Sequence, residues 1–446
     1  MIRLTNEQRR FAASVVVAPL KAIAPRCTHA LFTLILILAL FPVKTWSRRP
    51  QSERSAPARR AKSRTDAAKQ QTGLRISAIN DPGNRRPVGP HSQREAVVRA
   101  AILLDRLKFS PGEISITYNS NLAKAISAFQ SASGLPATRN VDPATWAALN
   151  DDQSTNGQVP QKQGNQNQPV QSVNQQNQAD AQQHQPKPQE EQPQQPPAQT
   201  QAQVETQALV TYIITPEDVA GPFTTVPKVS GRDAGERLML REARFPRLNY
   251  ESPLQLLAEK FHASPRLLIE LNPRKAFHKA GGQILVPNVL TPDPPPAASV
   301  LVDGSARSVT ALDSNGKILA FYPATVGSEH DPLPVGTWAI DEVTRYPKFK
   351  YNPNLFWDAE NRKPRAILPP GPKNPVGVVW IGLSRKHYGI HGTPEPSKIG
   401  LTQSHGCIRL TNWDATELSK IVHVGTPAVL KDGANAEEKP PVASSK

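Results

Sequence analysis

The chain has 446 residues, which is too long for a single hydrophobic core, so it should form two or three domains joined by linkers. Its 45 prolines and 25 glycines leave much of the chain unsuited to packing, whereas a hydrophobic content of 38% still suffices for compact domains. The formal net charge of +16 favours an anionic partner. Neither zinc-finger spacing nor an aromatic and basic reading face is present, so a membrane or a polyanionic wall is preferred to nucleic acid.

Residues 30–43 read ALFTLILILALFPV, a short apolar run that follows several basic residues (Arg3, Arg9, Arg10, Lys21 and Arg26). Positive charge before an apolar run marks the cytoplasmic side, so residues 1–46 are predicted to be an n-region with a signal peptide or signal anchor. No A-x-A cleavage site follows the apolar run, and a cleaved signal peptide and an uncleaved signal anchor both stay open. Either way, the rest of the chain should be exported, with residues 30–43 as the inner-membrane anchor if they are not cleaved.

Three segments are predicted to be disordered because they cannot bury enough apolar surface. Residues 47–90 are rich in Arg, Lys, Ser and Pro and should form a basic tether. Residues 151–208 are dominated by Gln, Asn and Pro and should form a flexible linker. Residues 433–446 should form a tail.

Residues 91–150 show helical periodicity and predict a small domain of three helices. Asp142 and Pro143 supply an N-cap and a first-turn proline for the third helix. The stretch from residue 104 to 149 resembles the peptidoglycan-binding domain found beside many cell-wall enzymes, which implies wall binding. The glycine-rich turn usual before the second helix is replaced here by residues 115–120, and a plain helical spacer remains the alternative.

Residues 209–290 predict a second small unit. Ser252-Pro253 and Ser264-Pro265 each open a short apolar helix, with a strand-like TYIIT before them and QILVP after them. This order resembles an α+β LysM carbohydrate-binding module, although a long insertion separates the first strand from the helices.

Residues 297–432 read as mostly β. Asp303-Gly304 and Asn315-Gly316 are dipeptides typical of tight hairpins. One helix is expected after Thr411, where Asp414 could complete a capping box. The fold class is therefore multidomain, with a mainly β domain, a β-sandwich or barrel with a helix, at its C-terminal end.

Cysteine occurs at two positions, Cys27 beside the apolar run and Cys407 in the last domain, and the two are not expected to pair. A thiol with a pKa of about 8.5 needs a base to become a nucleophile near neutral pH. His405 is two residues from Cys407 and would point parallel to it on a strand. His391 comes from a separate segment and is the better candidate base.

A His-Gly pair, then Ser-His-Gly-Cys-Ile-Arg, with His391 sixteen positions before Cys407, resembles the signature of the YkuD-type L,D-transpeptidases. The resemblance implies that Cys407 attacks a tetrapeptide stem at diaminopimelate, releases D-alanine and passes the acyl group to an amine. It implies no metal and no cofactor. The remaining implied roles are these: Gly392 orients His391, Gly406 and Cys407 form the oxyanion hole, Ser404 and His405 shape the turn, Arg409 holds a carboxylate, and Tyr388 lines the site.

Two other functions remain open. The acyl-enzyme could pass to water, which would make the protein a peptidoglycan hydrolase, either an L,D-carboxypeptidase or an amidase. The chain could instead be a non-catalytic wall-binding scaffold. For a transferase, the acceptor is either another stem peptide, giving a 3-3 crosslink, or an outer-membrane protein. The order of the segments suggests a periplasmic protein.

Overall fold

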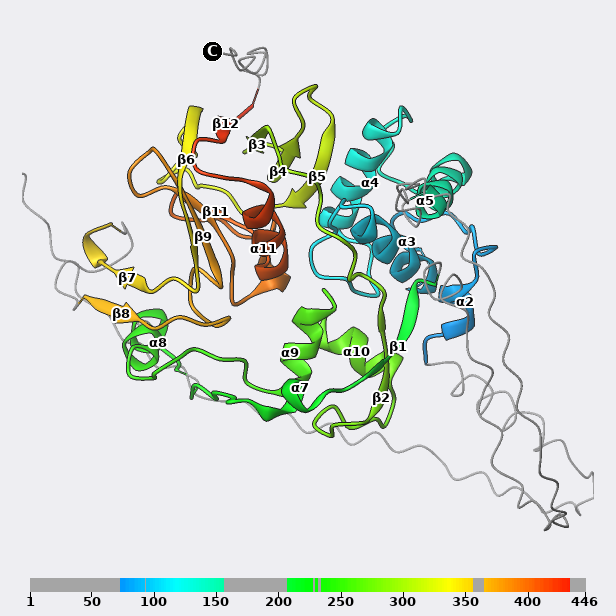
Figure 1. Cartoon of the computed structure of the whole chain (residues 1–446), viewed down its shortest axis with the longest axis horizontal. Coiled ribbons are helices and arrows are strands. Elements are labelled where there is room, and N and C mark those ends of the chain that lie inside the picture. The colour runs from blue at the N-terminus through cyan, green and yellow to red at the C-terminus, as the bar shows by residue number, and fades with distance from the viewer. Residues whose placement is uncertain are drawn as a thin grey trace, which may run out of the picture. The chain divides into compact units, whose positions relative to one another are not determined.

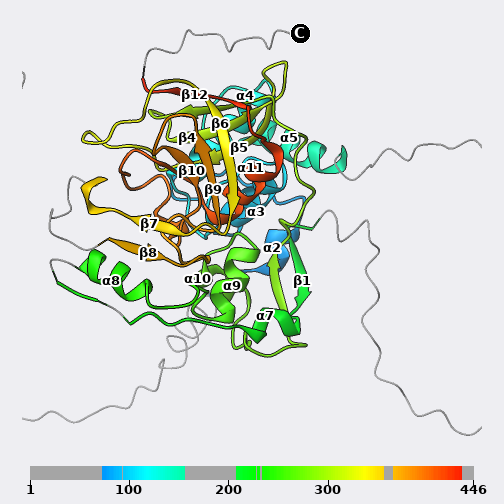
Figure 2. The ribbon, with the colours of Figure 1, turned by 60° about the vertical axis from the view of Figure 1, so that its left-hand side comes forward.

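The computed structural model describes residues 73–92, 94–155, 207–227, 229–231, 234–355 and 365–433 (Figures 1 and 2). The expected signal segment at 30–43 lies outside these residues, as do nearly all of the expected linker and tail. Within the described ranges, no helix combines the length and the apolar character needed to span a membrane.

Four helices occupy the N-terminal described region, α2 (Ile76–Asn80), α3 (Arg94–Arg106), α4 (Ser120–Ala132) and α5 (Pro143–Thr155). The side chain of Asn119 caps α4 by accepting a hydrogen bond from the Leu122 amide at 2.9 Å. Asp142 accepts from the Thr145 amide at 2.8 Å at the start of α5. Trp146 and Leu149 of α5 are fully buried.

The ordered chain extends into the region expected to be tether. Residues 74–90 include α2, and the side chains of Ile79 and Val88 are completely buried. Val88 and Val141 exchange two backbone hydrogen bonds, and Arg99 donates to the Ile79 carbonyl at 3.0 Å. The expectation of disorder up to residue 90 was wrong for this stretch, because a few apolar residues among many basic ones carry no periodic signal.

Residues 207–290 form two strands, β1 (Leu209–Ile213) and β2 (Gln283–Pro287), that pair antiparallel. Between them lie α7 (Pro216–Ala220), α8 (Ala234–Glu242), α9 (Pro253–Lys260) and α10 (Pro265–Leu271). Ser252 and Ser264 cap α9 and α10, and each is followed by proline at the first helical position, as expected. The expected insertion contains α7 and α8.

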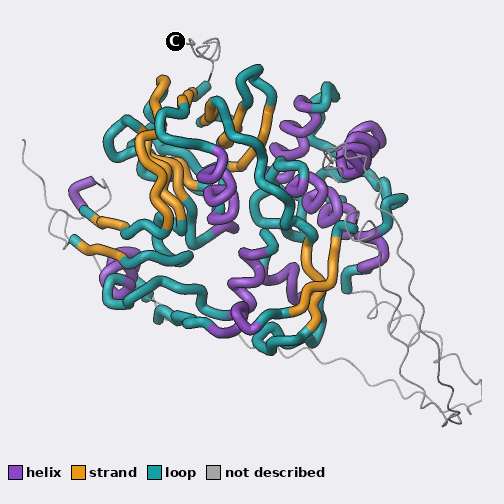
Figure 3. The backbone as a smooth tube through the Cα atoms, in the orientation of Figure 1, coloured by secondary structure: helices purple, strands orange, loops and turns teal. Residues whose placement is uncertain are grey.

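The mainly β domain contains one sheet of eight strands in the order β11-β10-β9-β6-β12-β3-β4-β5. Figure 3 shows most of its strands lying together, with the helices of residues 73–155 packed next to β5. The bounds are β3 (Ser299–Asp303), β4 (Ser308–Leu312), β5 (Ile318–Pro323), β6 (Gly336–Arg345), β9 (Val379–Leu383), β10 (Gly389–His391), β11 (Ile408–Arg409) and β12 (Pro427–Lys431). A separate pair consists of β7 (Phe349–Tyr351) and β8 (Ala366–Leu368), and two 3₁₀ turns are η2 (Pro353–Leu355) and η3 (Pro396–Lys398).

The sheet curls around the long strand β6. Residues 336–339 of β6 pair with β12, residues 340–345 pair with β9, and the register shifts between Ile340 and Glu342. An isolated bridge between Thr325, just beyond β5, and Arg409 in β11 joins the two ends of the strand order. The expected sandwich or barrel is thus a single curled sheet whose ends meet at Arg409.

Helix α11 (Asn412–Ile421) packs against β9 and β10. The Thr411 hydroxyl accepts from the Asp414 amide at 3.1 Å, so the expected N-cap is present. The Asp414 carboxyl is buried and its Oδ2 has no hydrogen-bond partner, which differs from the reciprocal bond of a capping box. Ala415, Leu418 and Ile421 face the core of the sheet.

Backbone hydrogen bonds tie the helical region to the curled sheet. Phe321 in β5 donates to the Lys108 carbonyl at 2.8 Å and accepts from the Ser110 amide at 2.9 Å. Lys108 also pairs with Glu417 of α11 at 2.6 Å. On α4, the Asn121 amide donates to the Ile399 carbonyl at 2.8 Å. The segment between His391 and Cys407 therefore rests partly on the helical region.

Candidate active site

The register of β10 and β11 brings His391 and Cys407 to one face of the sheet. The two strands run parallel, with Ile390 beside Ile408 and His391 beside Arg409. Both isoleucines are fully buried in the core of the sheet, so the alternate residues project from the opposite face. Cys407 directly precedes β11 and lies on the same face as Arg409. It is therefore a diagonal neighbour of His391.

His391 is 3% exposed and its ring is fixed by two neighbours. Nδ1 lies 2.7 Å from the Gly392 carbonyl oxygen, the contact expected from the sequence. The Trp380 ring stacks on the imidazole with centroids 5.6 Å apart. Because a carbonyl oxygen only accepts, Nδ1 carries the proton and Nε2 keeps its lone pair. Burial, aided by the charge of Arg409, lowers the pKa of His391 to about 3, so the ring is neutral at physiological pH.

Cys407 is half-buried, and its Sγ lies 3.7 Å from the His387 carbonyl oxygen. Burial raises the pKa of the thiol, and the charge of Asp331 acts in the same direction. The Gly389 amide and the Arg409 guanidinium oppose this by favouring the thiolate. Both groups are consequently neutral at rest, because the thiol of Cys407 is protonated and the imidazole of His391 is uncharged.

The turn before Cys407 depends on Gly406, whose φ is +93°. A Cβ at this position would lie 2.8 Å from Cε1 of Tyr388, so the Tyr388 ring covers the glycine. The buried Ser404 hydroxyl donates to the Cys407 carbonyl at 2.6 Å. Four predicted site residues, Ser404, Gly406, Tyr388 and Cys407, thus lie together, and His405 lies within the same turn.

Three residues of this neighbourhood were missed from the sequence. Trp380 stacks on His391, Asp331 acts electrostatically on the thiol, and Thr325 pairs with Arg409 through 2.8 and 3.0 Å backbone bonds. The Asp331 carboxylate has a buried Oδ2 without a hydrogen-bond partner. The family resemblance includes Trp380-Ile381-Gly382 but assigned Trp380 no role, and nothing in the sequence signals Thr325 or Asp331.

Asn412, the first residue of α11, supports the histidine from behind. Its Oδ1 accepts from the Val378 amide at 3.2 Å, and a Cβ on Gly392 would lie 2.2 Å from that oxygen. Its Nδ2 donates to the Pro372 carbonyl at 3.2 Å and to Oε1 of Glu259, on α9, at 3.0 Å. Residue Gly392, which holds Nδ1 of His391, therefore packs directly on a side chain that is bonded to the preceding module.

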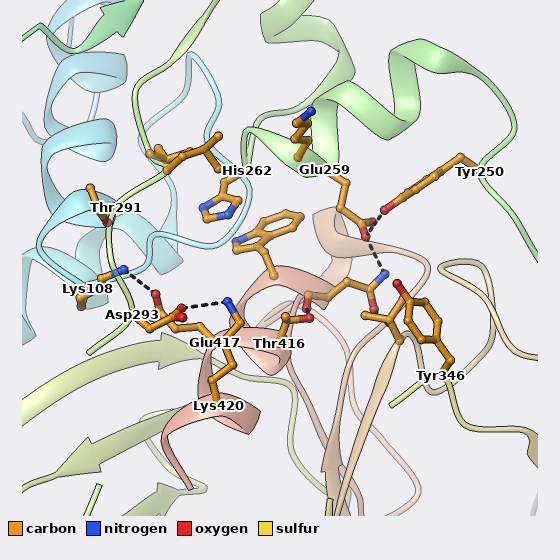
Figure 4. Close-up of a pocket in the computed structure, with 16 residues that line it drawn as sticks. Lys108, Tyr250, Glu259, His262, Thr291, Asp293, Tyr346, Thr416, Glu417 and Lys420 are labelled. Atoms are coloured by element: carbon orange, nitrogen blue, oxygen red, sulfur yellow. Dashed lines mark hydrogen bonds and ion pairs between the residues drawn. The ribbon is translucent and has the colours of Figure 1, made fainter. Parts of the chain in front are cut away.

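Figure 4 shows the cavity beside this contact, with a volume of about 300 Å³. The Tyr250 hydroxyl donates to Glu259 at 2.7 Å, and burial raises the pKa of that carboxyl to about 7. Two ion pairs, Lys108 with Glu417 and Lys420 with Asp293, line the same cavity. Its lining contains none of the predicted site residues and comes from the helical region, the 207–290 module and the catalytic domain.

Two segments of the chain match known protein families. Residues 297–430 match the L,D-transpeptidase catalytic domain, and residues 93–149 match the putative peptidoglycan binding domain. A putative L,D-transpeptidase YkuD of Bacillus licheniformis is 31% identical over 175 residues, which cover 39% of this chain and 90% of that protein. The chain belongs to the YkuD family of L,D-transpeptidases.

Two further matches have related names. The Bacillus subtilis protein of that name is 32% identical over 178 residues, which cover 40% of this chain and 92% of that protein. A solved structure of L,D-transpeptidase 3 from Mycobacterium tuberculosis, with a faropenem-derived adduct, is 20% identical with a TM-score of 0.26. That match covers 33% of this chain and 66% of the other.

This L,D-transpeptidase accordingly has a mainly β catalytic domain and a peptidoglycan-binding domain. Strands β3, β6 and β12 lie within that catalytic domain, in the region that the sequence predicted to be mostly β. The LysM resemblance of residues 209–290 has no counterpart among the matched families, and the expected peptidoglycan-binding match is present.

Proposed function

We propose that Cys407 is the nucleophile of the transpeptidase reaction and that His391 is its base. Nε2 of His391 takes the thiol proton while Sγ attacks the carbonyl carbon between diaminopimelate and D-alanine of a donor stem. The resulting oxyanion is held by the Gly406 and Cys407 amides. The C–N bond then breaks, and the imidazolium returns its proton to the leaving D-alanine amine, which leaves a thioester.

An amine completes the cycle. It attacks the thioester carbonyl, gives a proton to His391, and displaces Sγ, which regains the proton. The observation that carries the proposal is the His391 ring: buried, neutral and bonded through Nδ1 to Gly392, with Nε2 available on the face that holds Cys407. Cys407 need not be ionised before the substrate binds, because proton transfer to His391 and attack by Sγ occur together. Arg409 binds a stem carboxylate as a fixed guanidinium beside the thiol.

The acceptor is a stem-peptide amine, which gives a 3-3 crosslink, or the terminal residue of an envelope protein. Water as acceptor would make the same thioester the intermediate of a carboxypeptidase. The buried Oδ2 of Asp331, without a hydrogen-bond partner and electrostatically coupled to Cys407, favours an ammonium-bearing acceptor over water. Peptide products formed with and without an added amine would distinguish the two outcomes.

The same proposal places the protein in the periplasm, exported by residues 1–46, with the peptidoglycan-binding domain holding the wall. Residues 209–290 act as a LysM-like module, since a strand pair encloses α9 and α10 in the order of that fold. The alignment with the Bacillus licheniformis protein covers 175 residues, which is more than residues 297–446 contain. The alignment therefore includes part of the segment before residue 297.

The test is acylation of the full-length protein by a carbapenem, whose strained lactam a thiolate opens, followed by intact-mass measurement. We expect one covalent adduct on the native protein, none on Cys407→Ala, and acylation slowed about a hundredfold in His391→Gln. Lys317→Gln, an exposed change in the same domain, serves as the control and should react as the native protein does. An adduct on Cys407→Ala would contradict the assignment, and an unreactive native protein would favour a wall-binding scaffold.

A further inference from the structure

A groove with a volume of about 390 Å³ lies between the peptidoglycan-binding domain and the catalytic domain. One wall is helix α4, and the other is the turn from residue 303 to 308 between β3 and β4, with Phe321 of β5 beneath. Figure 1 shows α4 beside β5. The walls are held in place because Phe321 exchanges backbone hydrogen bonds with the chain at Lys108 and Ser110.

The lining of the groove is hydroxylic and cationic. On α4, Ser120, Lys124, Ser127 and Ser131 follow the spacing of one helix face. The groove is also lined by Arg139 and, from the catalytic domain, by Ser305, Ala306 and Ser308. No carboxylate lines it, and its volume falls in the range of ligand sites.

Lys124 is electrostatically unsatisfied in this groove. It is half-buried, and its ammonium is 3.4 Å from the Arg307 carbonyl oxygen. Burial, together with the charges of Arg307 and Arg139, lowers the pKa of Lys124 to about 8. Among the described residues, none of these three cations forms an ion pair with a carboxylate. An anion entering the groove would relieve this repulsion.

The groove adjoins the loop that carries the active-site turn. The Arg307 guanidinium donates to the Gly400 carbonyl at 3.2 Å, and the Gly400 amide donates to the Thr325 hydroxyl at 2.9 Å. Thr325 pairs with Arg409. A ligand bound at Lys124 would therefore sit against the wall of the transpeptidase site, on the side of the peptidoglycan-binding domain.

We propose that this groove binds the carboxylate-bearing stem peptide of a peptidoglycan strand, with Lys124 and Arg139 as the cations that recognise it. Peptidoglycan stems present several carboxylates on a chain next to hydroxylated sugars, which suits two cations set among serine hydroxyls. The site is composite: one domain supplies the cations and the other supplies the opposite wall. This inference rests on the proposed function for its substrate class, and its test reads binding rather than turnover.

The experiment measures binding of a soluble disaccharide-tetrapeptide to the full-length Cys407→Ala protein, which cannot turn it over. We expect Lys124→Gln and Arg139→Gln each to weaken binding about tenfold, with a smaller salt dependence, while Lys317→Gln has no effect. Amidation of the probe's carboxylates should weaken its binding to the Cys407→Ala protein, which retains Lys124, to the same degree. Arg139 is exposed, so its variant keeps the test valid if Lys124→Gln does not fold.

Unchanged affinity in both variants would overturn the proposal, as would equal binding of the amidated probe or no binding at all by the parent protein. Carbapenem acylation of the native protein, measured in parallel, reports on Cys407 alone. Loss of acylation with retained groove binding would remove the catalytic proposal and leave this one standing. The reverse pattern would remove the groove and leave the catalytic proposal standing.

Discussion

His391 is kept neutral by its surroundings, and this has a consequence for stability. Its pKa is lowered to about 3 by burial and Arg409, whereas an unfolded histidine titrates near 6.5. The unfolded chain therefore binds this proton first as pH falls. The stability linked to His391 is complete above about 6.5 and is lost progressively down to about 3.

Replacing His391 by Gln should remove that dependence. Between pH 7 and pH 5 we expect the native protein to lose about 2 kcal/mol more unfolding free energy than His391→Gln. Urea titrations of both proteins at the two pH values would measure this. Equal losses in the two proteins would mean that His391 is not held neutral by the fold.

The reactivity of Cys407 should respond in opposite directions to its two charged neighbours. Arg409 favours the thiolate and Asp331 disfavours it. We expect Arg409→Gln to slow iodoacetamide alkylation of Cys407 at pH 7 by about tenfold, and Asp331→Asn to speed it by a smaller factor, because a unit of pKa is tenfold in thiolate. Rates as a function of pH would give both shifts. Shifts of the same sign would contradict this account of the site.

At the scale of elements, the turn before β11 can be tested with a matched pair of glycines. Gly406 and Gly425 have nearly the same φ, +93° and +95°, but only Gly406 is covered by Tyr388, since nothing lies within 4 Å of a Cβ at Gly425. Alanine at either position should cost about 1–2 kcal/mol of unfolding free energy for the left-handed backbone. Only Gly406→Ala should also slow carbapenem acylation, by about tenfold or more, since it moves Cys407.

Measuring unfolding and acylation on both alanine variants separates backbone strain from displacement of the thiol. If Gly425→Ala slowed acylation as much as Gly406→Ala, loss of stability would explain both effects, and Tyr388 would have no part in placing the turn.

The elements that the sequence predicted are those with strong local signals. The two Ser-Pro pairs predicted α9 and α10, the Asp-Gly and Asn-Gly dipeptides predicted the hairpins of β3 to β5, and Thr411 predicted the start of α11. The folded structure of residues 74–90 was not predictable in this way. There Val88 is held by a bridge to Val141, a contact that no local pattern encodes.

For the whole molecule, the contact between Glu259 and Asn412 joins the 207–290 module to the catalytic domain. Burial raises the pKa of Glu259 to about 7, so the folded protein favours the protonated carboxyl, although the hydrogen bonds from Tyr250 and Asn412 favour the carboxylate. The stability linked to Glu259 is complete below the unfolded pKa of the carboxyl and is lost as pH rises through about 7. Besides those two hydrogen bonds, the charges of Lys373 and His262 oppose the shift.

We therefore expect amide hydrogen exchange in α9 and α11, corrected for intrinsic rates, to be faster at pH 8 than at pH 6. In Glu259→Gln, which stays neutral and keeps its hydrogen-bonding shape, the pH difference should disappear. A difference that persists in this variant would assign the effect to another group, such as Asp414, whose pKa burial also raises, to about 8.

Such contacts between modules are the part of the fold that the sequence could not supply. Asn121 and Ile399 are far apart in the chain, and neither residue type indicates the other as a partner. The nearness of His391 and Cys407 in the fold was predictable because one motif carries both residues, and the register of β10 and β11 places them on one face of the sheet. The groove at Lys124 was not, because its two walls come from different domains.

The protonated state of Cys407 bears on oxidative damage. Peroxide attacks thiolates far faster than thiols, and burial holds this sulfur in the thiol form until a base and a substrate meet it. A permanently ionised cysteine would be converted to sulfenic acid whenever oxidants were present. Here the burial that keeps the Cys407 thiol protonated also protects the sulfur from oxidation.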